Sequence, residues 1–139
     1  MLNDHETWCN GAPRKALQDA DLTRAIIMHA IEVHSKLGPG LLETVYEACL
    51  AYELTSAGYK VERQKHLPVT YKGLEIDQGF RMDLVVENRV IRELKCVEKI
   101  LPIHEAQLYT YLKLSGLRTG LLINFFTKVL KDGLKRIVC

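Results

Sequence analysis

The sequence has no long apolar run, few aromatic residues and almost no net charge. None of its apolar segments approaches the roughly 18 residues that a membrane-spanning helix needs. Its amino-terminal segment, MLNDHETWCNGAPRK, lacks the basic start and apolar core of a signal peptide. We therefore expect a soluble, cytoplasmic protein with no membrane partner. The 139 residues, 47% of them hydrophobic, exclude a disordered chain and suit one compact domain.

Familiar small DNA-reading modules are also missing. The cysteines form no CxxC pair and no zinc-finger spacing with histidine, and no helix-turn-helix signature is present.

The net charge of +2 hides an asymmetry, because residues 1–57 carry a net −4 and residues 58–139 a net +6. A basic carboxyl-terminal half permits a polyanionic partner without requiring one.

Hydrophobic periodicity predicts two helices, a three-strand meander, a third helix and a further strand. The expected helices begin after Asp21 or Thr23, at about Leu41 and at Pro102, and they end before Gly38, at about Ala57 and before Gly116. The expected strands cover residues 59–71, 74–86, 90–96 and 119–124, and residues 133–138 form a last strand or a short helix. We expect an α/β domain over residues 21–139, preceded by a poorly ordered lead-in over residues 1–20.

Three charged residues lie where a strand pattern does not require them. Glu93 and Lys95 are two residues apart on the third strand, so both point to one face. If residues 87–89 form the loop, Asp83 on the second strand lies opposite Glu93 and shares that face. A two-residue loop would instead send Asp83 to the other face, so this prediction depends on the turn length.

Two carboxylates at cross-strand distance repel each other unless a cation lies between them. A divalent metal and Lys95 would supply that positive charge, and a site made of carboxylate oxygens suits Mg²⁺ or Mn²⁺. Lys95 would then position the nucleophile or stabilise the transition state of phosphate hydrolysis. The alternative is a solvated Asp–Lys–Glu ladder on an exposed sheet face, and spacing alone does not separate the two.

Further polar residues could join this site. Glu43, Tyr46 and Glu47 line one side of the second helix, and a glutamate there is either a third carboxylate ligand or a helix-surface acid favoured by the helix dipole. Gln107 and Tyr111 share one face of the third helix, and Gln107 could orient a carboxylate or simply lie on the surface. A basic carboxyl-terminal cluster could hold phosphates or form a solvated edge. It consists of Lys128, Lys131, Lys135 and Arg136.

Taken together, these residues resemble a known family. The segment Gly40-Leu-Leu-Glu-Thr-Val-Tyr46 fits the motif of the GxxExxY proteins. Asp83 with Glu93-Leu-Lys95 resembles the PD-(D/E)xK nuclease superfamily, to which that family is assigned. The segment from Gln107 to Tyr111 is similar to the QxxxY motif of the exonuclease branch.

The resemblance implies a restriction-endonuclease-like αβββαβ core, with a mixed central sheet flanked by helices. It also implies Asp83 and Glu93 as metal ligands, Lys95 as the catalytic lysine and Glu43 as an auxiliary acid. Gln107 and Tyr111 would assist the site or contact nucleic acid. The expected activity is Mg²⁺-dependent hydrolysis of nucleic acid, DNA rather than RNA. The alternatives are a non-catalytic module that binds nucleic acid or protein on the same fold, and a homodimer that cleaves only when assembled.

Overall fold

A computed structural model of the protein describes residues 19–139, apart from the side chains of residues 77 and 78. The predicted lead-in over residues 1–20 therefore falls almost entirely outside the described residues. The helices are α1 (Ala20–Leu37), α2 (Glu43–Ser56) and α3 (Pro102–Ser115), with a short 3₁₀ helix η1 (Leu130–Gly133). The strands are β1 (Val61–Tyr71), β2 (Leu74–Val86), β3 (Val90–Lys95), β4 (Thr119–Asn124) and β5 (Leu134–Val138). Residues 133–138, left open between a strand and a helix, thus form mainly a strand.

The five strands form one mixed sheet in the order β1-β2-β3-β4-β5. Strands β3 and β4 are parallel, and the other neighbouring pairs are antiparallel. A parallel pair needs a crossover connection, and α3 provides it between β3 and β4. The structure confirms the predicted α/β class and the αβββαβ order of the core.

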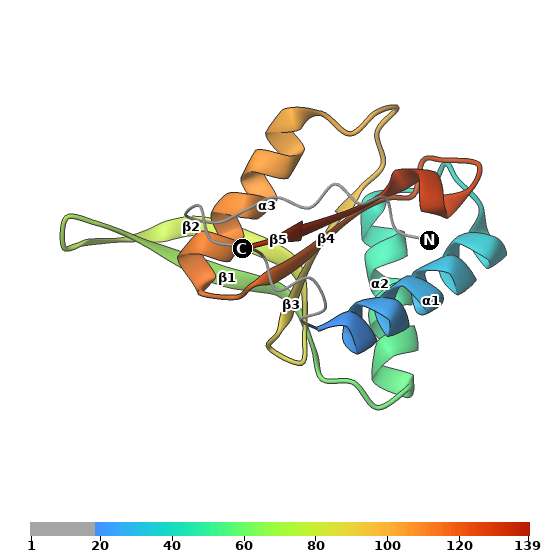
Figure 1. Cartoon of the computed structure of the whole chain (residues 1–139), viewed down its shortest axis with the longest axis horizontal. Helices are drawn as coiled ribbons and strands as arrows, with labels where there is room; N and C mark the ends of the chain where they lie inside the picture. The colour runs from blue at the N-terminus through green and yellow to red at the C-terminus, as the bar shows by residue number, and fades with distance from the viewer. Residues whose placement is uncertain (1–18) are drawn as a thin grey trace.

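Helices cover both faces of the sheet (Figure 1). Helices α1 and α2 pack on one face through a core that includes Ile26, Leu50 and Leu94. Helix α3 packs on the other face through Leu108 and Leu112, which join Ile91 of β3. The central strands are therefore buried on both sides, as is typical of sheets with parallel pairs. Among the described helices, none is long and apolar enough to cross a membrane.

A short connection links α1 to α2 and leads directly into the first turn of α2. Its two glycines, Gly38 and Gly40, have φ angles of 70° and 104°, which side chains rarely tolerate. The buried Tyr46 hydroxyl donates to the Gly38 carbonyl and accepts the Leu41 N–H at 3.1 Å. The tyrosine of the GxxExxY-like segment thus fixes the chain that precedes Glu43.

The long β1–β2 hairpin carries a register shift at Pro68. The register shifts between Leu67 and Val69, which leaves extra residues on β2. Gly79 lies in this bulge, and a Cβ atom there would stand 2.1 Å from the Leu67 carbonyl oxygen. Only glycine allows the two strands to approach this closely.

Candidate active site

Asp83 and Glu93 face each other across β2 and β3. The register pairs Val86 with Val90 and Leu84 with Arg92, so residues 87–89 form the three-residue loop on which the prediction depended. Continued by one step, this register sets Asp83 opposite Glu93.

Side chains replace the backbone ladder between these two residues. The Glu93 carboxylate accepts the Asp83 N–H at 3.1 Å, and the Asp83 Oδ2 atom accepts the Leu94 N–H at 2.8 Å. Each carboxylate is therefore held by the backbone of the other's strand. The two acidic groups are fixed in orientation as well as brought together.

The carboxylates form an electrostatically unfavourable pair. Burial, followed by the negative charge of Asp83, raises the pKa of Glu93 to about 8, against the opposing effects of the Asp83 N–H and of Lys95. Tyr111 of α3 belongs to the same neighbourhood. Burial, followed by the charges of Glu93 and Asp83, raises the pKa of its hydroxyl to about 12. The charges of Glu93 and Asp83 thus act on the Tyr111 hydroxyl, and a role of Tyr111 in the site stays a prediction.

Lys95 is the last residue of β3 and is half-buried. Strand alternation puts it on the side of the sheet that Glu93 occupies, and its charge acts on the Glu93 carboxylate. Among residues 19–139, no hydrogen-bonding or ion-pairing partner holds its ammonium group. The cation is thus close to the carboxylate pair and available to a bound molecule.

Glu43 approaches the end of the same strand from α2. Its Oε1 atom accepts the N–H of Cys96 at 3.1 Å, directly after Lys95. Glu43 and Cys96 also border a surface cavity of about 510 Å³ whose wall includes Phe126. Glu43 is therefore tied to the β3 backbone rather than gathered with the other two carboxylates.

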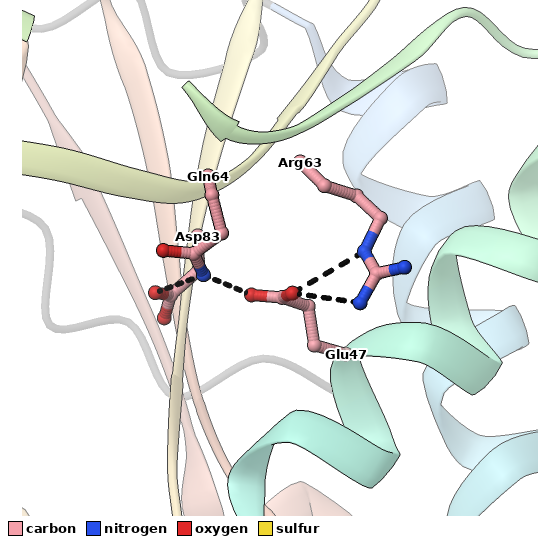
Figure 2. Close-up of polar contacts among 4 residues, drawn as sticks. All are labelled: Glu47, Arg63, Gln64 and Asp83. Atoms are coloured by element: carbon pink, nitrogen blue, oxygen red, sulfur yellow. Dashed lines mark hydrogen bonds and ion pairs between the residues drawn. The ribbon is translucent and has the colours of Figure 1, made fainter. Parts of the chain in front are cut away.

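Glu47 and Gln64 connect α2 to Asp83, and Arg63 also binds Glu47 (Figure 2). The Gln64 side-chain amide donates to Glu47 Oε1 at 2.5 Å and to Asp83 Oδ1 at 3.4 Å. Arg63 binds the other Glu47 oxygen through Nη2 at 3.1 Å and Nε at 3.3 Å. Glu47 lies one turn after Glu43 on the helix side that the sequence marked, whereas no sequence pattern marked Arg63 or Gln64.

Arg92 is a buried cation on the opposite side of β3 from Glu93. It is 0% exposed, and none of its three guanidinium nitrogens has a hydrogen-bond partner in the described part of the chain. Burial lowers its pKa to about 9, while the charges of Asp83, Glu93 and Glu47 oppose the shift. Its positive charge offsets the surrounding carboxylates from within the core.

The remaining predicted residues are dispersed. Gln107 is half-buried on α3, and no hydrogen bond to the carboxylates fixes it among the described residues. The basic carboxyl-terminal cluster is not one surface. Lys135 forms an ion pair with Glu105 at 2.8 Å, and the Arg136 side chain is buried in β5. The exposed members of the basic cluster are Lys128 and Lys131.

The donor chemistry of this region fits a hard divalent cation. Asp83 and Glu93 offer carboxylate oxygens, and burial together with the charge of Asp83 disfavours an ionised Glu93 unless a cation lies beside it. Within residues 19–139, however, no three acidic, histidine or cysteine side chains lie together as a ready-made metal cluster. Asp83 and Glu93 fit a divalent cation, and a third protein ligand would have to move toward that cation.

Comparison with known proteins places the chain in a family. A family model described as the PD-(D/E)XK nuclease superfamily matches residues 20–137. No curated protein and no solved structure matches the chain significantly. The match spans α1 to β5, includes every residue of the carboxylate pair and its lysine, and agrees with the restriction-endonuclease-like order of elements. The chain therefore belongs to the PD-(D/E)XK nuclease superfamily.

Proposed function

We propose that this protein is a Mg²⁺- or Mn²⁺-dependent nuclease that hydrolyses phosphodiester bonds, in DNA rather than RNA, and that it is a member of the GxxExxY group of its superfamily. The observation that carries the proposal is the coupled pair of Asp83 and Glu93 beside Lys95, whose ammonium group has no partner within residues 19–139. Nucleases of this superfamily typically use a divalent metal. We assign residues 21–139 to the nuclease-like domain and residues 1–20 to a lead-in.

In this proposal Asp83 and Glu93 would hold the metal, with Glu43 as the third carboxylate. The bound cation would supply positive charge that acidifies water and neutralises the scissile phosphate. Lys95 would orient the attacking water and stabilise negative charge that develops on the phosphate. Tyr111 and Gln107 would line the side of the site formed by α3, and Lys128 and Lys131 would contact the substrate backbone.

The test is a cleavage assay on single- and double-stranded DNA and RNA with Mg²⁺, with Mn²⁺ and with EDTA. Wild-type protein should cleave DNA only when metal is present, and Asp83→Ala should lose that activity. Asp132→Ala, which removes an exposed carboxylate from η1, should cleave like wild type. The nuclease proposal fails if wild-type protein leaves every substrate intact.

A second candidate is a non-catalytic module that holds nucleic acid or protein on the same fold. One observation favours it, namely that Glu43 is bonded to the Cys96 backbone and not gathered with the carboxylate pair. Calorimetric titration separates the two functions. Retention of DNA in a gel shift without any Mg²⁺ or Mn²⁺ binding would support the binding module. Sedimentation at several protein concentrations would reveal a homodimer.

A further inference from the structure

Asp83 occupies a gap in the sheet on both sides of β2. Toward β3, the backbone pairing extends only as far as Leu84 with Arg92. Beyond it, the Asp83 side chain accepts the Leu94 N–H instead. Toward β1, the register pairs Arg63 with Leu84 and Lys65 with Met82, and it skips Gln64 and Asp83, which lie opposite each other. In place of ladder hydrogen bonds, the Leu94 N–H and the Gln64 side chain hold the Asp83 carboxylate.

Gln64 fills this gap with a strained backbone. Its φ angle is 48°, a left-handed conformation that residues other than glycine rarely adopt inside a strand. Such strain persists only where the surrounding contacts hold it in place, and it is often found at functional sites. Here the side-chain amide reaches two carboxylates, because its nitrogen donates both to Glu47 and to Asp83 (Figure 2).

Helix α2 is consequently fastened to the sheet at two points one helical turn apart. Glu43 bonds to the backbone N–H of Cys96 after β3. Glu47, which is 5% exposed, bonds through Gln64 to Asp83 of β2. Both Glu47 oxygens are occupied by Gln64 and Arg63, so Glu47 serves as an anchor and not as a free ligand.

We propose that Gln64 is a positioning residue that sets the Asp83 carboxylate, and with it the spacing between Asp83 and Glu43 of α2, for metal binding. The proposal rests on the nuclease function above. It assigns Gln64 no contact with substrate. A residue that orients a metal ligand typically contributes about 10- to 100-fold in metal affinity.

The first test measures Mn²⁺ affinity by calorimetry for wild type, Gln64→Asn and Gln64→Gly. Asparagine keeps an amide and tolerates the left-handed backbone, but its side chain is one methylene shorter. Glycine relieves the backbone strain and removes the amide altogether. Both variants should bind Mn²⁺ about 10- to 100-fold more weakly than wild type. His66→Gln changes an exposed residue of the same strand and should bind like wild type.

The second test needs no metal. Hydrogen exchange of the Leu94 amide, which donates to Asp83 Oδ2, should accelerate in both Gln64 variants. Exchange of the Leu122 amide, at the centre of β4, should stay unchanged and report an intact fold.

The two tests separate the possible failures. If the wild type binds no Mn²⁺ while Leu94 exchange accelerates in the variants, the nuclease proposal fails and the positioning of Asp83 by Gln64 stands. If Leu94 exchange and Mn²⁺ affinity match the wild type in both variants, the role of Gln64 is refuted.

Discussion

At the scale of single residues, the site combines buried acids with too little compensating charge. Glu93 carries the clearest consequence, because burial and the charge of Asp83 raise its pKa from 4.5 to about 8. In metal-free protein, folded Glu93 then holds its proton over a pH range in which the unfolded chain has lost it. Glu93 therefore adds to the free energy of unfolding at the low end of this pH range, and its contribution is lost as the pH rises.

We therefore predict that the free energy of unfolding of the metal-free protein falls between pH 4.5 and 8, the window set by the two Glu93 pKa values. The slope from this one group cannot exceed about 1.4 kcal/mol per pH unit. Urea denaturation in EDTA at several pH values measures it. Glu93→Gln should flatten the dependence, whereas exposed Glu98→Gln should not. A wild-type curve as flat as that of Glu93→Gln would contradict the raised pKa of Glu93.

The sequence predicted the Asp83–Glu93 pair because strand alternation and a three-residue loop fix which side chains meet. It could not predict the Gln64 bridge. A left-handed φ at a glutamine depends on contacts with α2 and β2, and no local pattern encodes such contacts. Nor could it predict that Arg92 is buried without hydrogen-bond partners in the described chain, since an arginine beside a glutamate is ordinary on a surface strand.

At the scale of elements, the connection from α1 into α2 sets the position of Glu43. Tyr46 stacks on Phe125 at 4.4 Å between ring centroids, and its hydroxyl holds the Gly38 carbonyl and the Leu41 N–H. The helix is thereby tied both to its own entry loop and to the end of β4.

Tyr46→Phe should keep the stacked ring but lose both hydrogen bonds, which we expect to lower the free energy of unfolding by about 1 kcal/mol. Urea denaturation is the measurement. Tyr52→Phe is a matched control, because Tyr52 lies on the same helix and is 71% exposed. If the two variants unfold at the same urea concentration, the hydroxyl of Tyr46 does not stabilise the connection.

Element boundaries were predicted well where glycine or proline punctuates the chain, as at Gly38, Pro102 and Gly116. Strand β4 was predicted with its observed bounds, because a short apolar run in a mixed sheet is distinctive. The start of α2 was placed too early. Leu41 and Leu42 continue the apolar pattern, but Leu42 has extended backbone angles and the helix begins at Glu43.

At the scale of the whole molecule, the charge asymmetry of the sequence follows the layers of the fold. The acidic half includes α1 and α2, and the basic half contains the sheet and α3. The carboxylate pair lies within the basic half, and Glu43 of the acidic half bonds to the backbone at the end of β3. A polyanionic substrate is therefore expected to approach from the side of the sheet and α3.

The most direct test of the nuclease site is the single-turnover cleavage rate of Lys95→Ala in Mg²⁺, measured together with its Mn²⁺ affinity. We predict a rate about 100- to 1,000-fold below that of wild type, because a preorganised positive charge is lost from the reacting phosphate. Mn²⁺ binding should persist, since Asp83 and Glu93 remain. Lys99→Ala, which removes an exposed lysine just beyond β3, should cleave normally. Equal cleavage rates for Lys95→Ala and wild type would contradict the assignment of this site.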